Sequence, residues 1–94
     1  MIRARPDTHD YWLDGKPILV TWTEGEIMAR LCQYAGYTTP LDVLLEIWGE
    51  SRAQYGYHIV SNAIGRLKAK LPAGAIECRK GIGYRLTLPV EMVG

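Results

Sequence analysis

Four apolar residues spaced along one face of a helix constrain the fold of this chain more than any other feature. Val60, Ile64, Leu67 and Leu71 follow one another at intervals of four, three and four residues, which is the spacing of a helix that buries one side. Pro72-Ala73-Gly74 comes next and ends that pattern. The spacing therefore predicts an amphipathic helix over about residues 57–71.

A β-hairpin is predicted directly after this helix. Residues 76–79 and 84–88 are short strand-like runs, and the segment between them contains Gly81 and Gly83. Glycines between two such runs are typical of a hairpin turn. Because no helix follows Gly81-Ile82-Gly83, we interpret this segment as a turn and not as a phosphate-binding loop.

A second hairpin is predicted near the start of the chain. Asp14-Gly15 separates residues 11–13 from residues 16–20, and both flanking runs are largely apolar. Asp-Gly favours a tight hairpin turn because both central residues need positive φ angles. Pro17 has no backbone N–H to donate, so it predicts an edge position for the second strand, or a strand that starts outside the ladder.

Two more helices are predicted between the hairpins. The first opens within residues 21–26, where either Thr21 with Glu24 or Thr23 with Glu26 has the spacing of a capping box. Its buried stripe contains Ile27, Met28, Leu31 and Cys32, and Gly36 marks its end.

The second of these helices is predicted to start with Thr39 as its cap and Pro40 at its first position. Gly49 is expected to end it, and the polar residues 50–56 are expected to form a loop.

The order of hairpin, three helices and hairpin predicts an α+β fold, a winged helix-turn-helix with the last hairpin as the wing. A chain of 94 residues is one small domain. We expect a flexible arm over residues 1–10, the winged-helix domain over 11–88 and a short tail over 89–94.

The near-neutral net charge of +1 conceals two opposed regions. Residues 1–56 contain five Lys and Arg against eight Asp and Glu, whereas residues 57–88 contain six against one. Exposed charges are screened over about 8 Å at physiological salt, so a distant acidic region subtracts little from a basic one. The basic region coincides with the third helix and the last hairpin, and it keeps a nucleic-acid partner plausible on physical grounds.

Several other classes of protein are excluded or disfavoured. No run of 18 apolar residues exists to span a membrane, and no apolar run near the N-terminus indicates a secretory signal. Cys32 and Cys78 have no metal-ligand spacing, and two cysteines make no disulfide framework. No catalytic constellation is evident, so we expect neither an enzyme nor a cofactor or metal site, and we expect a cytoplasmic protein.

The ordered motifs resemble the OmpR/PhoB-type winged-helix DNA-binding domain, the output domain of two-component response regulators, over residues 11–88. The L-T-x-x-E of that family is matched by Val20-Thr21-Trp22-Thr23-Glu24, and its Trp-Gly pair by Trp48-Gly49. Its recognition helix V-D-V-H-I-x-R-L-R-x-K-L corresponds to residues 60–71, and its wing I-x-T-V-R-G-x-G-Y-R to residues 76–85. The set in this order is far more specific than any one piece.

The resemblance implies binding to double-stranded DNA and regulation of transcription. It places Arg66 and Lys68 in the major groove, Lys80 in the minor groove and His58 at a phosphate. It also implies contact between the 50–56 loop and RNA polymerase. From side-chain chemistry and position, we add Ser61, Asn62, Gly65, Lys70, Arg79 and Arg85 as DNA-binding candidates, since Asn can read adenine and Arg guanine.

The departures from the family pattern lead to further expectations. Gly25 replaces a usual aromatic residue and is expected to loosen the first helix. Lys68 and Lys80 replace arginines and lose bidentate geometry, which softens base readout. Only about ten residues precede the first predicted strand, so we expect a standalone regulator without a receiver domain.

Two alternatives stay open at this point. The chain could be a protein-interaction module that binds RNA polymerase or a response regulator, and an enzyme is the third reading. Because the non-specific affinity of such a small domain for DNA should be modest, a homodimer on DNA, or a partner, is also expected.

Overall fold

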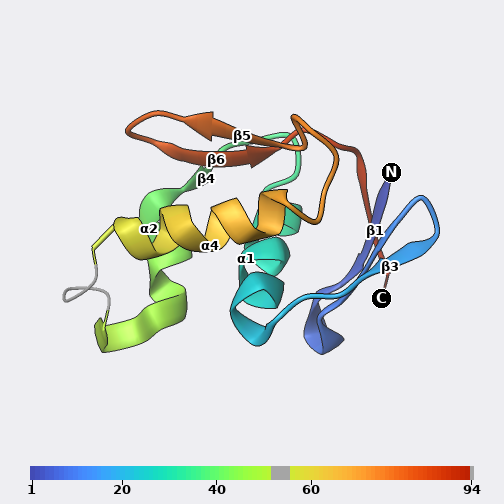
Figure 1. Ribbon diagram of the computed structural model, residues 1–94, viewed down its shortest axis with the longest axis horizontal. Helices are drawn as coiled ribbons and strands as arrows, with labels where there is room; N and C mark the ends of the chain where they lie inside the picture. Colours follow the sequence, from blue (N-terminus) through green and yellow to red (C-terminus); the bar gives the residue numbers. More distant parts are fainter. Residues whose placement is uncertain (52–55, 94) are drawn as a thin grey trace.

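The computed structural model describes residues 1–51 and 56–93, and over these residues the chain has an α+β fold. Three α-helices pack together, a four-stranded sheet lies at one end of the molecule, and a three-stranded sheet runs along α4 (Figure 1). The predicted fold class, a winged helix-turn-helix, is therefore confirmed. The helices are α1 (Trp22–Gln33), α2 (Leu41–Leu45) and α4 (His58–Lys68).

The four-stranded sheet joins the two ends of the chain. Its order is β3-β2-β1-β7, and β1 pairs in parallel with β7 but antiparallel with β2. Ile2 and Ala4 are fully buried in β1, while Arg3 and Arg5 alternate with them on the exposed side. The strands are β1 (Ile2–Arg5), β2 (Asp10–Leu13), β3 (Lys16–Ile18) and β7 (Val90–Met92).

This pairing corrects two predictions. The expectation of a flexible arm over residues 1–10 is wrong, because β1 and the short 3-10 helix η1 (Pro6–Thr8) belong to the folded domain. The expectation of a free tail over 89–94 is wrong for residues 90–92, which form β7. Ile2 and Ala4 alternate with arginines, and that period of two is a strand pattern that the charged residues obscured.

The predicted first hairpin is confirmed. Asp14 and Gly15 both have positive φ angles, 49° and 85°, as a tight turn between antiparallel strands requires. Pro17 lies in β3, which is an edge strand of the sheet, as predicted.

Helix α1 begins with a complete capping box. Thr21 Oγ1 accepts a hydrogen bond from the Glu24 backbone N–H, and a Glu24 carboxylate oxygen accepts one from the Thr21 backbone N–H. The first of the two predicted capping pairs is therefore correct. The predicted stripe of Ile27, Met28, Leu31 and Cys32 is buried.

The prediction of one capped helix from Thr39 to Trp48 is wrong. Thr39 and Pro40 form the short strand β4 (Thr39–Pro40), in which Thr39 pairs with Tyr84, and the Thr39 hydroxyl caps nothing. The α-helical part of this region is only α2, and a 3-10 segment, η2 (Glu46–Ser51), follows it. Gly49 has a φ of 56° and interrupts the helical geometry there.

The structure describes only part of the predicted 50–56 loop. Its first two residues belong to η2, which corrects the predicted start of the loop. Residues 52–55 lie outside the described residues.

The predicted third helix and wing are confirmed with shorter bounds. In α4, Val60, Ile64 and Leu67 are buried as expected, and Leu71 is buried just beyond the helix. The wing consists of β5 (Ile76–Arg79) and β6 (Gly83–Leu86), which form a sheet with β4 in the order β4-β6-β5.

Gly83 allows β4 to approach the wing closely. A Cβ atom at this position would lie 1.8 Å from the backbone oxygen of Thr39. Only glycine fits such a contact, because the neighbour is backbone and cannot turn away. The second glycine of the wing thus fixes β4 to the wing, while Gly81, with a φ of 78°, serves the turn.

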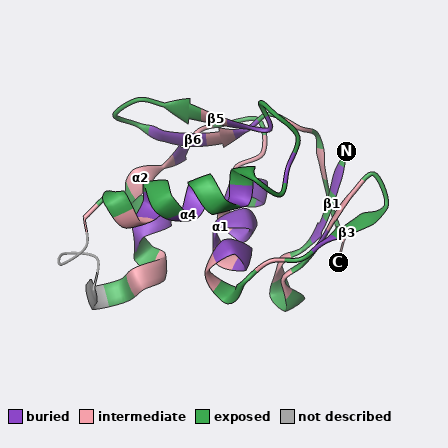
Figure 2. Cartoon of the chain, in the orientation of Figure 1, coloured by how far each residue is buried: buried purple, intermediate pink, exposed green. Residues whose placement is uncertain are grey.

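One buried core connects all these elements. Figure 2 shows buried residues on the inner sides of α1 and α4 and along β6 and β1, with exposed residues on the outer side of α4 and at the wing tip. The core therefore leaves one face of α4 free for other contacts.

Candidate nucleic-acid interface

The outer face of α4 carries most of the predicted site residues. Four residues of the helix are buried, and the predicted residues of the helix lie on the opposite, exposed side. Those exposed residues are His58, Ser61, Asn62, Gly65, Arg66 and Lys68. An exposed helical face without apolar residues has the chemistry of a surface that meets a polar partner.

Gly65 lies in the middle of this face with open space above it. A Cβ atom added there would meet no heavy atom within 4 Å. The fold itself does not need a glycine at this position, although glycine costs about 1 kcal/mol relative to alanine inside a helix. The missing side chain therefore leaves room only for something outside the chain.

A groove connects the start of α4 to the wing. It has a volume of about 220 Å³ and brings His58 and Ser61 of the helix together with Arg79 and Lys80 of the wing. Tyr57 and Ile82 are exposed nearby, with 53% and 61% of their surfaces accessible. Two of the predicted elements thus form one continuous surface, as the resemblance implies.

The cations of the wing differ in their partners. Glu77 accepts hydrogen bonds of 3.1 Å from both Arg79 and Arg85. The bond from Arg85, followed by its charge and by Arg79, holds the pKa of Glu77 below its ordinary value. Lys80 forms no ion pair with any described residue, so it is the uncommitted cation at the wing tip.

A similar division occurs at the other end of α4. The Lys70 ammonium lies 2.5 Å from Glu24 Oε1, and Arg66 Nε lies 3.8 Å from Glu24 Oε2. Burial alone would raise the pKa of Glu24. The hydrogen bonds from Lys70 and from the Thr21 backbone, with the charges of Lys70 and Arg66, hold that pKa below its ordinary value instead. The Lys70 ammonium is therefore engaged in an ion pair within the domain, although 36% of its side chain is exposed.

The carboxylates Glu24 and Glu77 are the functional neighbours that sequence reasoning missed. Glu24 belongs to the acidic half of the sequence, yet it lies against Arg66 and Lys70 of the basic half. Its capping-box spacing explained its presence and gave no sign of this second role. Glu77 had a signal, since residues two apart on one strand face the same side and Arg79 follows it by two.

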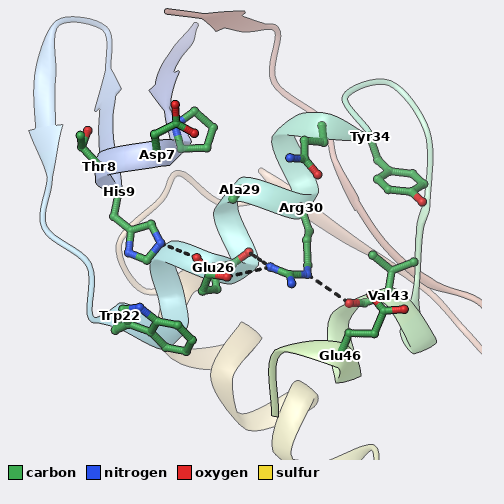
Figure 3. Close-up of a pocket in the computed structure, with 12 residues that line it drawn as sticks. Asp7, Thr8, His9, Trp22, Glu26, Ala29, Arg30, Tyr34, Val43 and Glu46 are labelled. Atoms are coloured by element: carbon green, nitrogen blue, oxygen red, sulfur yellow. Dashed lines mark hydrogen bonds and ion pairs between the residues drawn. The ribbon is translucent and has the colours of Figure 1, made fainter. Parts of the chain in front are cut away.

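A second groove, with a volume of about 840 Å³, lies away from this face, between η1, α1 and α2. Figure 3 shows His9 and Arg30 pointing toward Glu26 from opposite sides. His9 Nε2 is 2.6 Å from one Glu26 oxygen, and Arg30 Nη1 is 3.1 Å from the other. These bonds, that from His9 foremost, outweigh burial and lower the pKa of Glu26.

This cluster accounts for Gly25. A Cβ atom on Gly25 would lie 2.5 Å from the His9 ring, so the glycine makes room for the histidine. The Tyr11 hydroxyl also donates a 2.7 Å hydrogen bond to the Gly25 carbonyl. The space expected to loosen α1 is thus filled by His9, which joins the η1 segment to α1.

Two further findings concern only the part of the chain that the structure describes. No helix there is long and apolar enough to cross a membrane. No group of three or more His, Cys, Asp or Glu side chains in those residues could hold a metal ion.

The regulatory protein VanRB of Enterococcus faecalis is 35% identical to the chain over 82 residues. The match covers 86% of the chain and 37% of VanRB, so the chain spans little more than a third of the length of that relative. No protein-family model matches the chain.

Solved structures share the fold. The DNA-binding domain of Bacillus subtilis CssR superposes with a TM-score of 0.73 at 23% identity, over 93% of this chain and all of that domain. The DNA-binding domain of the response regulator AdeR was solved in complex with an intercistronic region. It superposes with a TM-score of 0.60 at 21% identity, over 90% of this chain and 92% of that domain's chain. The chain therefore has the winged helix-turn-helix fold of these DNA-binding domains.

Proposed function

We propose that the chain binds double-stranded DNA sequence-specifically and regulates transcription, with α4 in the major groove and the wing tip in the minor groove. The observation that carries this proposal is the continuous exposed surface formed by the outer face of α4, the 220 Å³ groove and Lys80. An α-helix fits the width of the major groove of B-DNA. The related fold of AdeR was solved on an intercistronic region, which supports the same use of this fold here.

The exposed side chains divide into two roles in this proposal. Asn62 and Arg66 project from the middle of α4 and read base edges, Asn toward adenine and Arg toward guanine. Lys68 lies in the major groove with Arg66, whereas His58 contacts a phosphate and Lys80 the minor groove, where a point charge suffices.

Arg79 and Arg85 support the wing through Glu77 in this proposal. Arg79 keeps 53% of its side chain exposed, so it also adds positive charge beside the DNA. Arg85 is half-buried and bonded to Glu77, so its contribution is mainly to the shape of the wing.

A binding role fits the chemistry of the described residues better than a catalytic one, and the cytoplasmic location expected from the sequence is kept as part of the proposal. The carboxylates of Glu24, Glu26 and Glu77 are each bonded to side chains of the domain, Glu24 in a buried position and Glu77 at the surface of the wing. Carboxylates held in such ion pairs are more typical of structural contacts than of a reaction site.

The first experiment selects bound sequences from a random duplex pool and then measures affinity for the selected and the random duplex over a range of salt. We expect specific binding whose affinity falls with rising salt concentration as it would if roughly four to six phosphates were neutralised. No binding at low or moderate salt would overturn the proposal and favour a protein partner, RNA polymerase or a response regulator. The oligomeric state on the selected site follows from the same titration.

Two variants test the assignment of roles. Arg66→Ala should weaken binding to the selected site by about 1–3 kcal/mol and relax specificity at one position. Lys80→Ala should weaken selected and random duplexes alike and reduce the salt slope by about one. Arg3→Ala and Lys16→Ala are the matched controls, because both residues are exposed in the distant four-stranded sheet.

A further inference from the structure

A buried carboxylate lies directly beneath the C-terminal part of the recognition helix. Glu24 is only 2% exposed, although it carries a charge that a protein interior tolerates only when it is paired. Its partners come from two elements: the Thr21 backbone at the start of α1, and the side chains of Arg66 and Lys70.

The two cations hold Glu24 with unequal strength. The Lys70 ammonium donates hydrogen bonds of 2.5 Å to Glu24 Oε1 and of 2.8 Å to the Leu19 carbonyl. Arg66 Nε lies 3.8 Å from Glu24 Oε2, too far for a hydrogen bond, and 57% of the Arg66 side chain is exposed. Lys70 therefore satisfies the carboxylate, while Arg66 stays close to it without being bonded.

We propose that Lys70 is a positioning residue that neutralises Glu24 and thereby leaves the Arg66 guanidinium available for DNA. This inference rests on the proposed function and revises the sequence-based prediction that Lys70 contacts DNA itself. Although the Lys70 side chain is 36% exposed, its ammonium is bonded within the domain, and Lys70 acts on DNA binding through Arg66.

Removal of Lys70 would leave the buried Glu24 carboxylate without its closest cation. A buried carboxylate that loses its partner is strongly unfavourable, so it recruits the nearest remaining cation. Arg66 is that cation among the described residues, and its planar guanidinium can form two parallel hydrogen bonds with a carboxylate. Arg66 would then turn inward and be lost to the DNA.

A double-mutant cycle tests this chain of events. Lys70→Met should weaken binding to the selected duplex about tenfold, the size of a lost base contact, and should lower the ratio of selected to random affinity. Glu24→Gln removes the charge that captures Arg66 and keeps a side chain suited to the capping box. The double variant Glu24→Gln with Lys70→Met should therefore recover both the affinity and the ratio to near the wild-type values.

A direct contact between Lys70 and a phosphate predicts a different pattern. The double variant would then stay as weak as Lys70→Met, because Glu24→Gln restores no contact to DNA, and this result would overturn the proposal. Lys68→Met is the matched control: its lysine has no carboxylate partner among the described residues, so Glu24→Gln should not rescue it.

Folding and function are kept separate in the same experiment. Thermal unfolding of each variant shows whether it is folded, and if Lys70→Met alone is unfolded, the double variant still decides the question by comparison with wild type. A wild-type chain that binds no duplex defeats the proposed function itself. A wild-type chain that binds, together with a double variant that does not recover, defeats only the inference about Lys70.

Discussion

Helices α1 and α4 pack against each other and are nearly equal in length, 12 and 11 residues, yet they use their polar residues in opposite ways. In α1, Glu24, Glu26 and Arg30 are all bonded to other elements of the domain. In α4, Ser61 and Lys68 have no side-chain partner among the described residues. The comparison shows that a helix becomes scaffold or binding surface according to where its polar groups find partners.

The glycines inside the two helices repeat this contrast. Gly25 of α1 is covered by the His9 ring, whereas Gly65 of α4 faces open space. One glycine makes room for a side chain of the same chain, and the other leaves room for a partner.

The strongest test of the comparison concerns the face that both helices share. Ile27 of α1 and Ile64 of α4 are both almost completely buried. Replacing either one with alanine should lower the free energy of unfolding by about 2–5 kcal/mol, because a cavity is left in the core. Urea denaturation measures this loss, and Leu19→Ala, at an exposed position, should change stability by less than about 0.5 kcal/mol. A large loss for only one isoleucine would mean that the helices do not share one core.

The second test places the same substitution in both helices. Gly25→Ala should destabilise the domain by about 1 kcal/mol or more, because its methyl group displaces His9 and breaks the bond to Glu26. Gly65→Ala should instead stabilise it by up to about 1 kcal/mol through helix propensity. Thermal unfolding measures both effects.

The same pair of variants separates stability from binding. If Gly65 lies against DNA, Gly65→Ala should weaken binding to the selected duplex although the domain is more stable. Equal affinity for Gly65→Ala and wild type would show that the open space above α4 is not used by the duplex.

The smallest expected effect is the loss of folding stability at low pH, to which the α1 carboxylates contribute. Glu24 and Glu26 have pKa values below their ordinary range, Glu24 through Lys70 and the Thr21 backbone against its burial, Glu26 chiefly through His9. Their stabilisation is therefore complete above the ordinary Glu pKa and is lost as the pH falls through the lowered folded-state pKa.

Unfolding measured from pH 6 down to pH 3, about the range over which glutamates titrate, should show this loss in the wild type. The slope should be shallower in Glu24→Gln and in Glu26→Gln. The exposed Glu46→Gln is the control and should keep the wild-type slope. Equal slopes in all variants would contradict the role given to the α1 carboxylates.

Local patterns predicted the elements whose stabilising contacts are close in sequence. The Asp14-Gly15 turn, the Thr21 capping box and the buried stripe of α1 depend on residues within a few positions of one another, and all are confirmed. The outer face of α4 followed from helix periodicity in the same way. Which of these residues touch DNA stays a prediction.

The errors concern contacts between distant residues. Strand β1 lies between β2 and β7, and its pairing with β7 joins it to residues near the opposite end of the chain. Thr39 leaves its expected capping role because β6 offers it a strand partner. The ion pairs of Glu24 with Lys70 and of His9 with Glu26 also join separate elements. Residue types alone predicted the charges, and only the tertiary fold determines which of them remain free.

The parallel pairing of β1 with β7 also has a mechanical consequence. The Ile2 backbone N–H donates to the Pro89 carbonyl, and the Val93 N–H donates to the Ala4 carbonyl, so hydrogen bonds secure both ends of the strand pair. Residue 1 precedes β1 and residue 93 follows β7, so tension between these points pulls the two parallel strands along their length in opposite directions. The bonds of the pair are then loaded together in shear and not opened one after another, and the sheet resists extension where the chain is handled from its two ends.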